Sequence, residues 1–330
     1  MSFIKKIIFI SFCIFSSFLV NAADAISNWS EVKFFIDDLV ENYNFDRNEI
    51  TNILKEAKFQ PKIIESMDRP YEKKKWDVYK SLFLTKKRLD SGVEFWQKNK
   101  KDLIAVEKKY GVPADVIVAI IGIETLYGEK QGNYRVLDAL TTLAFNYPSR
   151  SKFFTKELRE YLLLCKDQKV PATKYYGSYA GAIGVPQFMP SSYRYYAIDA
   201  NGNGQADLMN NNKDVIFSVA NYFKKNGWSN NAEVAEPAKI TSNAYKKLAT
   251  NTTKPNYKFT NIISSGVVPK ISRMKHPVQA GVIQLETDQG KEYWLGYDNF
   301  YVITRYNNSP QYALVVHLLS EQLRNKVLPK

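Results

Sequence analysis

The chain has 330 residues, of which 45% are hydrophobic, and its formal net charge is +13. This length is ample for a large core and predicts two domains, or one domain with an insertion. The chain has only two histidines and two cysteines. A Cys/His zinc centre is therefore excluded, and catalysis by a serine–histidine pair is disfavoured. We therefore expect carboxylates to do any acid–base work.

The N-terminus has the pattern of an export signal. Lys5 and Lys6 precede an apolar run over residues 7–20, which leads to a small-residue cleavage pattern. The run is too short and wrongly flanked for a permanent membrane span. We expect cleavage after Ala22 or Ala23, followed by export.

The cysteines and the net charge limit what the exported chain can form and bind. Cys13 lies inside the apolar run rather than after it, so we expect no lipid anchor. Cys165 then remains alone, which excludes an intramolecular disulfide. Removal of residues 1–22 takes two lysines and no acid, so the charge falls to +11. A basic exported protein favours anionic partners such as cell-wall polymer or lipid surfaces, and nucleic acid is not expected there.

Apolar residues recur at helical spacing along the first hundred residues after the signal. They do so over 32–43, from Trp76 onward and over 93–110. Asp46 and Glu49 form the pattern of a capping box before another helix. This part of the chain is therefore predicted to be α-helical.

The stretch 111–128, GVPADVIVAIIGIETLYG, predicts a buried central helix. Pro113 suits a first helical position and Asp115 suits a first turn. The following residues leave no polar face, as in a helix that is buried on all sides. About a dozen residues are too few to span a membrane. Glu124 falls in the last turn of this helix.

A carboxylate in that position is informative. Burial and the negative end of a helix both disfavour its charged form. A glutamic acid that stays protonated near neutrality can act as a general acid toward a leaving oxygen. The alternative is an ion pair with Arg135 or Arg150 that only holds elements together, and the helix alone does not decide between the two.

Helical patterns continue to about residue 228, and strand patterns follow. Helices are predicted over 137–145, 153–164 and 215–228, and the Gly- and Ala-rich stretch 177–189 permits tight turns. Beyond residue 230 the chain alternates with period two. We predict a hairpin with strands 282–287 and 292–297, a strand over 300–304 and a final helix over 310–324.

Several motifs in one order make the sequence resemble a known family. They are IGIETLYG around Glu124, FNYPSR, GSYAGAIGVPQFMPSSY, SVANYFKKNGW and NFYVITRYNNSPQYA. They are similar to motifs of soluble lytic transglycosylases in the membrane-bound lytic murein transglycosylase B family. The resemblance implies a mainly α (α+β) fold with a lysozyme-like catalytic core, an N-terminal helical segment, an EF-hand-like loop and a small inserted β domain. The implied organisation is a signal peptide 1–22, a helical domain 23–110, a catalytic core 111–230, a β domain 231–297 and a return to the core over 298–330.

The resemblance also implies an activity. Members cleave the bond between N-acetylmuramic acid and N-acetylglucosamine in peptidoglycan and leave 1,6-anhydromuramoyl ends. Glu124 would protonate the glycosidic oxygen and then, as a carboxylate, take a proton from the muramoyl 6-hydroxyl. No second acid occurs in the motif GSYAGAIGVPQFMPSSYRYY, whereas ordinary glycosidases use a pair. A muramidase-type hydrolase and a non-catalytic peptidoglycan-binding protein remain the alternatives.

By motif match, the resemblance assigns residues to sugar binding. Aromatic faces suit sugar rings, and hydroxyls and amides supply hydrogen bonds. The assigned residues are Ser178, Gln187, Phe188, Tyr222, Tyr306, Asn307, Tyr312, Arg150 and Tyr79. Ser149 stands where the family often has a second arginine, so one cationic contact to substrate is absent.

The stretch 199–207, DANGNGQAD, begins like an EF-hand calcium loop with glycine at position 6. The usual Glu at position 12 is absent, since Asn210 occupies it. The resemblance implies a longer loop, 199–214, closed by an aspartate. We expect a structural calcium ion, weakly held because two ligands are neutral, and the predicted ligands are Asp199, Asn201, Asn203, the Gln205 carbonyl and Asp214. The alternative is a turn that needs no metal.

The remaining expectations concern context. No organic cofactor is expected. The partners implied are peptidoglycan glycan strands and complexes of cell-wall synthesis or hydrolysis, without nucleic acid. The signal and the resemblance together imply a periplasmic location.

Overall fold

The computed structural model describes residues 30–68, 74–230, 232–252, 254–271 and 277–328. The chain divides into two compact units, residues 1–59 and 60–330. The signal peptide predicted over 1–22 lies outside the described residues, and the finer domain limits predicted from the sequence stay a prediction. Among the described helices, none has the length and apolar character needed to cross a membrane.

The first unit is described over two helices, α2 (Ser30–Tyr43) and α3 (Arg47–Lys55). The Asp46 carboxylate accepts a hydrogen bond from the Glu49 backbone N–H at 2.8 Å, so the predicted cap of α3 is confirmed. One face of α2 is buried, including Leu39 with no exposed surface.

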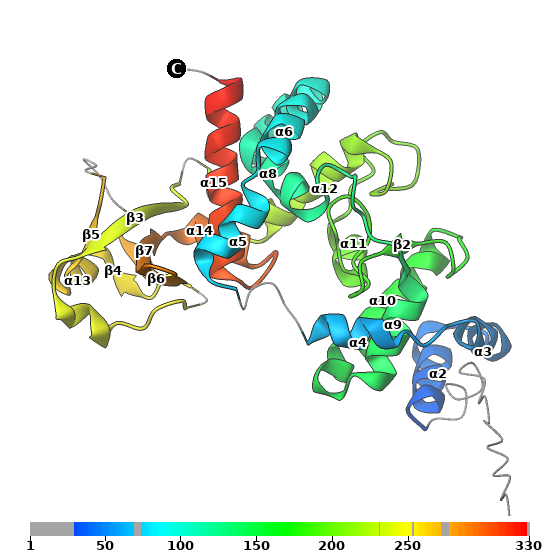
Figure 1. Ribbon diagram of the computed structural model, residues 1–330. Helices are drawn as coiled ribbons and strands as arrows, with labels where there is room; N and C mark the ends of the chain where they lie inside the picture. The colour runs from blue at the N-terminus through cyan, green and yellow to red at the C-terminus, as the bar shows by residue number, and fades with distance from the viewer. Residues whose placement is uncertain (1–29, 69–73, 231, 253, 272–276, 329–330) are drawn as a thin grey trace, which may run out of the picture. The chain divides into compact units, whose positions relative to one another are not determined.

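The second unit is mainly helical and carries one five-stranded sheet (Figure 1). Its helices are α4 (Pro61–Met67), α5 (Trp76–Phe83), α6 (Lys86–Lys98), α7 (Lys100–Tyr110), α8 (Ala114–Thr125), α9 (Val136–Asn146), α10 (Ser151–Asp167), α11 (Pro190–Tyr196), α12 (Asn212–Lys225), α13 (Phe259–Ser264), α14 (Asp298–Thr304) and α15 (Pro310–Val327), with 3-10 turns η2 (Pro148–Arg150) and η3 (Asn243–Lys247). Its strands are β1 (Tyr134–Arg135), β2 (Tyr176–Gly177), β3 (Ala235–Ile240), β4 (Tyr257–Lys258), β5 (Val267–Pro269), β6 (Gln279–Thr287) and β7 (Gly290–Gly296).

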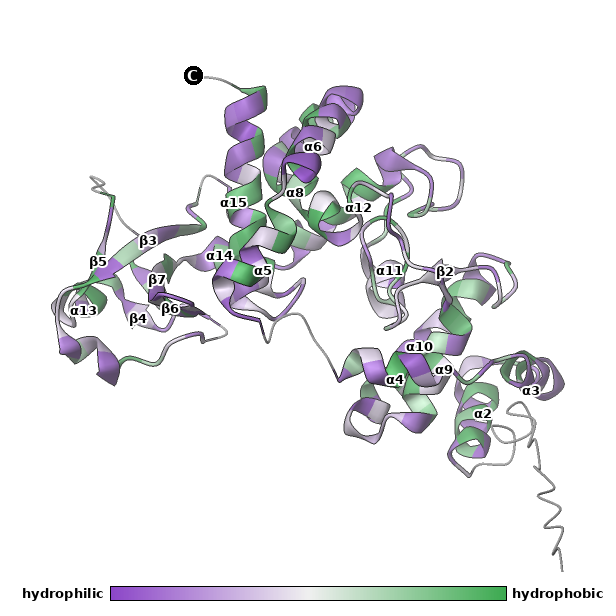
Figure 2. Ribbon diagram, viewed as in Figure 1, coloured by the Kyte–Doolittle hydropathy of each residue, from purple (hydrophilic) through white to green (hydrophobic). Residues whose placement is uncertain are grey.

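The central helix predicted from the sequence is α8, and the prediction is confirmed. Every residue of α8 except Glu124 is buried. The helix packs against α6, α7, α12 and α15. Figure 2 shows α15 as apolar near its start and hydrophilic toward its end, which matches its burial against α8. The apolar side chains on every side of α8 are thus covered by neighbouring helices.

Two polar contacts join α8 to α15, one near each end of α8. Asp115, in the first turn, is 2% exposed, and the Arg324 guanidinium donates to its Oδ2 at 2.9 Å from Nε and 2.5 Å from Nη2. At the other end, the Tyr312 hydroxyl donates to Glu124 Oε1 at 2.5 Å. The two helices are therefore fixed in register and run antiparallel.

The end of α8 is abrupt. Leu126 and Tyr127 have φ of 51° and 60°, and Gly128 follows at 94°, so three successive left-handed residues stop the helix directly after Thr125. The Tyr127 ring lies against two helical glycines. A Cβ on Gly92 or Gly122 would overlap the Tyr127 hydroxyl oxygen, so a side chain at either position requires the Tyr127 ring to move.

The sheet is antiparallel with strand order β4-β6-β7-β3-β5. Thr287 pairs with Gly290, so Asp288 and Gln289 form the tip of the predicted hairpin, which is confirmed. One face of the sheet packs on α13 around Ile262 and Tyr297. Elsewhere the sheet meets the helices, with a ring contact between Trp294 and His317.

Two sequence predictions are wrong. The strand predicted over 300–304 is the helix α14, in which Phe300 N–H bonds to Tyr297 O as in a helical turn. A short continuous apolar run does not distinguish a buried helix from a buried strand. The single helix predicted over 93–110 is two helices, because the chain leaves helical geometry at Asn99, whose side chain donates to Phe95 O.

Glu157 joins α10 to α11 and gives a test of the fold. It is 2% exposed, and its carboxylate accepts hydrogen bonds from Ser191 N–H at 3.0 Å and Ser191 Oγ at 2.7 Å. Burial raises the pKa of Glu157 above 4.5, against the lowering effects of the Ser191 bonds and Lys156, with Glu160 raising it further.

The variant Glu157→Gln can keep two hydrogen bonds to Ser191. Its stability relative to that of the native chain should depend on pH. A raised folded-state pKa gives the native chain stability that is fully present below the unfolded pKa. That stability is lost as pH rises through the folded pKa, and the loss is about 1.4 kcal/mol for each pH unit that separates the two pKa values. Urea unfolding from about pH 4 to pH 8 should show the native chain losing stability relative to Glu157→Gln. A difference that is constant across this range contradicts the assignment.

Candidate active site

Glu124 is the one half-exposed residue of α8 among its buried neighbours, and its carboxylate is held by Tyr312. The two side chains come from distant parts of the sequence, since Tyr312 lies in the first turn of α15. The Ser309 hydroxyl caps this turn by accepting the Tyr312 N–H at 3.2 Å. The capped helix start therefore sets the position of the hydroxyl that meets Glu124.

Aromatic rings predicted from separate motifs gather beside this pair. Tyr306 is stacked on Tyr312, with centroids 6.4 Å apart and planes 12° apart. Tyr222 lies 4.8 Å and Phe188 5.8 Å from Tyr306. We call Phe188, Tyr196, Tyr222, Tyr306 and Tyr312 the aromatic cluster.

The hydroxyls of the cluster are fixed donors. Tyr222 donates to Arg305 O and Tyr306 donates to Pro186 O, both at 2.6 Å. Burial raises the pKa of Tyr306, Tyr312 and Tyr222 above the ordinary value of 10.0, and the charge of Glu124 adds to the increase. These tyrosines therefore stay protonated over the range in which proteins are stable.

Within the described chain, Glu124 is the one carboxylate whose charge acts on the pKa of Tyr222 and Tyr306. The cluster thus offers a single acid in a shell of neutral rings and hydroxyls. Such an arrangement can move one proton, and its partly exposed rings, Tyr196 and Tyr306, can contact an uncharged ring by their faces.

The Gly-rich loop over 177–189 is tied to the end of α8. Thr125 Oγ1 donates to Val185 O at 2.8 Å and accepts from Gly128 N–H at 3.0 Å. Within the loop, Ile183 and Phe188 exchange both backbone bonds, at 2.8 and 3.1 Å. The loop that carries Phe188 is therefore rigidly positioned against the helix that carries Glu124.

Gln187 and Ser178 hold the same loop in shape. Gln187 has φ of 51°, and its Nε2 donates to Gln131 O at 3.0 Å and to Gly184 O at 2.9 Å. The Ser178 hydroxyl accepts the Ala182 N–H at 3.1 Å. Both side chains are half-buried, and their predicted part in sugar binding stays a prediction.

The other predicted sugar-binding residues lie at different distances from the cluster. Tyr79 is buried, and its interaction with Tyr312 contributes to the raised pKa of Tyr312, so it belongs beside the cluster. Asn307 is half-buried and follows Tyr306 directly. Arg150 is exposed, with its guanidinium over Phe153 and Phe154 at 4.7 and 5.0 Å from their centroids.

Sequence reasoning missed Tyr196. Its ring lies 4.6 Å from that of Tyr222 and 6.4 Å from that of Phe188, so it extends the aromatic cluster. The available signal was its place at the end of the motif that also contains Ser178 and Gln187.

The predicted calcium loop is held by its own oxygens. Asp199 accepts backbone N–H bonds from Gly202, Asn203 and Gly204, and these bonds, with Gly204 first, lower the pKa of Asp199. Asn201 and Asn203 each accept the backbone N–H two residues on. Within the residues described, no group of three or more His, Cys, Asp and Glu side chains is arranged to hold a metal ion.

Asp214, at the start of α12, closes this loop. Its carboxylate has no exposed surface, and its two oxygens accept the Ala200 and Asp207 N–H groups at 2.9 Å. Across the described chain no cation pairs with it. The side-chain acceptors of this loop are all oxygens, the type of ligand that calcium prefers.

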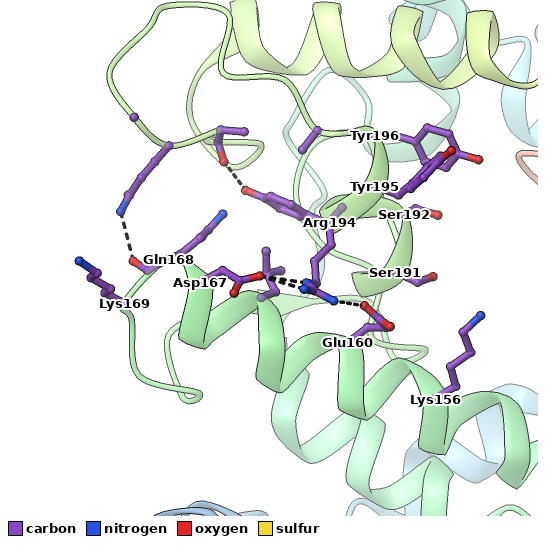
Figure 3. Close-up of a pocket in the computed structure, with 16 residues that line it drawn as sticks. Lys156, Glu160, Asp167, Gln168, Lys169, Ser191, Ser192, Arg194, Tyr195 and Tyr196 are labelled. Atoms are coloured by element: carbon purple, nitrogen blue, oxygen red, sulfur yellow. Dashed lines mark hydrogen bonds and ion pairs between the residues drawn. The ribbon is translucent and has the colours of Figure 1, made fainter. Parts of the chain in front are cut away.

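A cavity lies beside the calcium loop. It has a volume of about 1020 Å³ and is bounded by α10, α11 and residues 204–206 (Figure 3). Tyr196 is the residue that this cavity shares with the aromatic cluster.

Comparison with known proteins identifies the family. A model described as the transglycosylase SLT domain matches residues 27–321. Over 297 residues the chain is 38% identical to membrane-bound lytic murein transglycosylase B of Escherichia coli K12, covering 87% of this chain and 81% of that protein. The chain belongs to the transglycosylase SLT family.

Solved structures agree with this family. The E. coli lytic transglycosylase Slt35 in complex with calcium has a TM-score of 0.82 and 38% identity, covering 91% of this chain and 95% of that one. SltB3 of Pseudomonas aeruginosa in complex with NAG-NAM-pentapeptide has a TM-score of 0.78 and 27% identity, covering 92% and 80%. The lysozyme-like, mainly α fold expected from the sequence is confirmed.

Proposed function

We propose that Glu124 carries the reaction of this lytic transglycosylase as the acid and then the base. The chain is an enzyme of the peptidoglycan lytic transglycosylase class. The observation that supports Glu124 is its place as a single carboxylate among the neutral hydroxyls and rings of the aromatic cluster.

The first step breaks the bond between N-acetylmuramic acid and N-acetylglucosamine. The protonated Glu124 gives its proton to the glycosidic oxygen, and the bond from that oxygen to C1 of the muramoyl ring breaks. Positive charge then develops at C1. The substrate's own 2-acetamido oxygen meets this charge, as in substrate-assisted glycosidases.

The second step closes a ring within the substrate. The Glu124 carboxylate removes the proton of the muramoyl 6-hydroxyl, and that oxygen forms a bond to C1. The product end is a 1,6-anhydromuramoyl residue, and Glu124 regains its proton. The Tyr312 hydroxyl, which donates to Glu124 at 2.5 Å, stabilises the carboxylate between the two steps.

The substrate is the glycan strand of peptidoglycan. A relative binds a NAG-NAM-pentapeptide, which contains this disaccharide. Tyr306, which is partly exposed, supplies a ring face for a sugar, and the buried rings of Tyr222 and Phe188 pack against it. Ser178, Gln187 and Asn307 shape the adjoining backbone, and Tyr79 supports Tyr312.

The first test is Glu124→Gln, which keeps the shape and removes the acid. We expect turnover of purified peptidoglycan to fall ~10²–10⁴-fold while the protein stays folded. The matched control is Glu129→Gln, a glutamate on the same segment that is half exposed and pairs with Lys87, which should leave activity unchanged.

Mass spectrometry of the new muramoyl ends decides between the alternatives. Ends lighter by one water than reducing sugars support the ring closure. Reducing ends mean that water is the acceptor, as in a muramidase. An active, folded Glu124→Gln removes the proposed mechanism, and binding without cleavage by the native chain favours a binding protein.

We propose a calcium ion in the loop 199–214, as in the relative crystallised with calcium. The donors present are all oxygens, which calcium prefers. Asp199, Asn201, Asn203 and the Gln205 carbonyl would hold the ion, and Asp214 closes the loop. Its role there would be to hold the loop against α12.

Calorimetry with calcium chloride tests this site. At a hundredfold excess of calcium over its dissociation constant, stability should rise by about 2.7 kcal/mol and the melting temperature by about 5 °C. Asp214→Asn should reduce both the heat of binding and the rise in melting temperature. Magnesium, which demands stricter octahedral geometry, is the control. No heat and no change in melting temperature with calcium contradict the site.

We propose export to the periplasm by the N-terminal signal, without a lipid anchor. The E. coli relative is named membrane-bound. In this chain Cys13 lies within the apolar run of the signal and leaves with it. N-terminal sequencing of the secreted protein should begin at Ala23 or Asp24. A fatty-acid-labelled protein in the membrane fraction contradicts the proposal.

A further inference from the structure

One arginine joins the last turn of the helix that carries Glu124 to the end of a second helix. Arg88, on α6, donates from Nε to Gly122 O of α8 at 2.9 Å. Its Nη1 donates to Leu82 O at 3.1 Å and to Phe83 O at 2.5 Å, at the end of α5. A single guanidinium thus binds the C-terminal ends of two helices.

Both helix ends carry side chains of the candidate active site. Gly122 lies two residues before Glu124 in the last turn of α8. Tyr79, which lies beside the aromatic cluster, is one turn before the end of α5, and its ring centroid is 4.9 Å from that of Phe83. The guanidinium carbon of Arg88 lies 5.3 Å from the Phe83 centroid. Arg88 therefore contacts the supports of two side chains of the site.

We propose that Arg88 is a positioning residue for the reaction at Glu124. Its guanidinium fixes the turn that presents Glu124, and its positive charge stabilises the carboxylate that Glu124 becomes between the two steps. In this role Arg88 acts through α8 and does not touch the substrate. The proposal rests on the proposed function of Glu124.

Arg88 reaches this turn without occupying the face that Glu124 presents. Residues two apart lie about 200° from each other around a helix axis, so Arg88 binds α8 on a different side from the Glu124 side chain, which is left to Tyr312. Gly122 O also accepts the Leu126 N–H at 3.1 Å. Arg88 thus acts on the carbonyl that anchors the left-handed end of α8.

The charge of Arg88 is not balanced by an acid in the described part of the chain. Its side-chain bonds go to backbone carbonyls, and no carboxylate pairs with it there. Burial lowers the pKa of Arg88 below its ordinary value, against an opposing effect of Tyr127. A partly buried cation without an acid costs free energy, whereas a neutral donor could bind a carbonyl without this cost. A permanent cation suits a place where the neighbouring acid is negative in only part of the reaction.

The position of this charge gives it an effect on Glu124. The C-terminal end of a helix is negative and disfavours a carboxylate, and a cation there offsets that field. The effect falls off within the last turn, and the carbonyl that Arg88 binds lies in the last turn of α8. Arg88 should therefore favour the charged form of Glu124.

The groups that α12 and the segment around the start of α15 direct toward Glu124 are neutral. They are the tyrosines whose raised pKa values reflect burial and the charge of Glu124, namely Tyr222, Tyr306 and Tyr312. The charged groups described on the neighbouring elements are Arg305, which acts on Tyr222, the exposed pair of Lys87 and Glu129, and, at the start of α8, Glu107, Asp115 and Arg324.

The test uses two substitutions of Arg88 and one control. Arg88→Met removes the charge and the planar donor group, whereas Arg88→Lys keeps the charge and loses the planar group. Lys86→Met removes an exposed lysine of the same helix, which pairs with Asp90 one turn away, and is the control. For each chain, kcat for the formation of 1,6-anhydromuramoyl ends from purified glycan chains is measured from about pH 4 to pH 9. Melting temperature shows whether each variant is folded.

Arg88→Met should lower kcat by ~10²-fold, because a small displacement of a reacting group has an effect of this size. It should also change the pH profile. Without the cation, the protonated form of Glu124 that starts the reaction persists to higher pH, so the falling limb should move up by about half to one pH unit. Arg88→Lys should lower kcat and keep the native limb, and Lys86→Met should match the native chain in both.

Two results overturn the proposal. A profile of Arg88→Met that lies below the native profile by one factor at every pH means that Arg88 only stabilises the fold. A native kcat in Arg88→Lys means that the guanidinium positions nothing, and this comparison stands even where Arg88→Met does not fold. Failure of the proposed function looks different, because the native chain would then form no anhydromuramoyl ends, or Glu124→Gln would stay active.

Discussion

The pairing of α8 with α15 is the constraint on which the site depends. Asp115 with Arg324 at one end and Glu124 with Tyr312 at the other are the polar contacts of an otherwise apolar helix pair. Because α8 is buried on every side, it has no freedom to rotate, and its last turn presents Glu124 at a fixed angle. The C-terminal helix thus contacts a carboxylate that lies far earlier in the chain.

Two chemically different surroundings lie on either side of Tyr196. Around Glu124, burial raises the pKa of the tyrosines, so their hydroxyls stay neutral. Beyond Tyr196 the surface becomes charged on α10 and α11. Contacts of the Thr125 hydroxyl hold the Gly-rich loop against the end of α8.

The sequence predicted α8, its buried character and the position of Glu124, because a wholly apolar run of this length with one carboxylate is typical of a buried helix. It also predicted the β6–β7 hairpin, where the turn residues are distinctive. It failed over 300–304, where aromatic and β-branched residues resemble a strand and the structure has the helix α14. The contact of Tyr312 with Glu124 and the place of Tyr196 depend on tertiary packing, which no local pattern reports.

The Tyr127 ring, lodged between Gly92 and Gly122, limits how this enzyme can be engineered. Replacing a helical glycine by alanine is a routine way to stabilise a protein, with a typical gain of about 0.5–1 kcal/mol. Here the added methyl would collide with the hydroxyl of Tyr127, and Tyr127 is itself one of the left-handed residues that end α8. A consensus or thermostability library that substitutes these glycines would gain helix propensity while displacing the turn that follows Glu124.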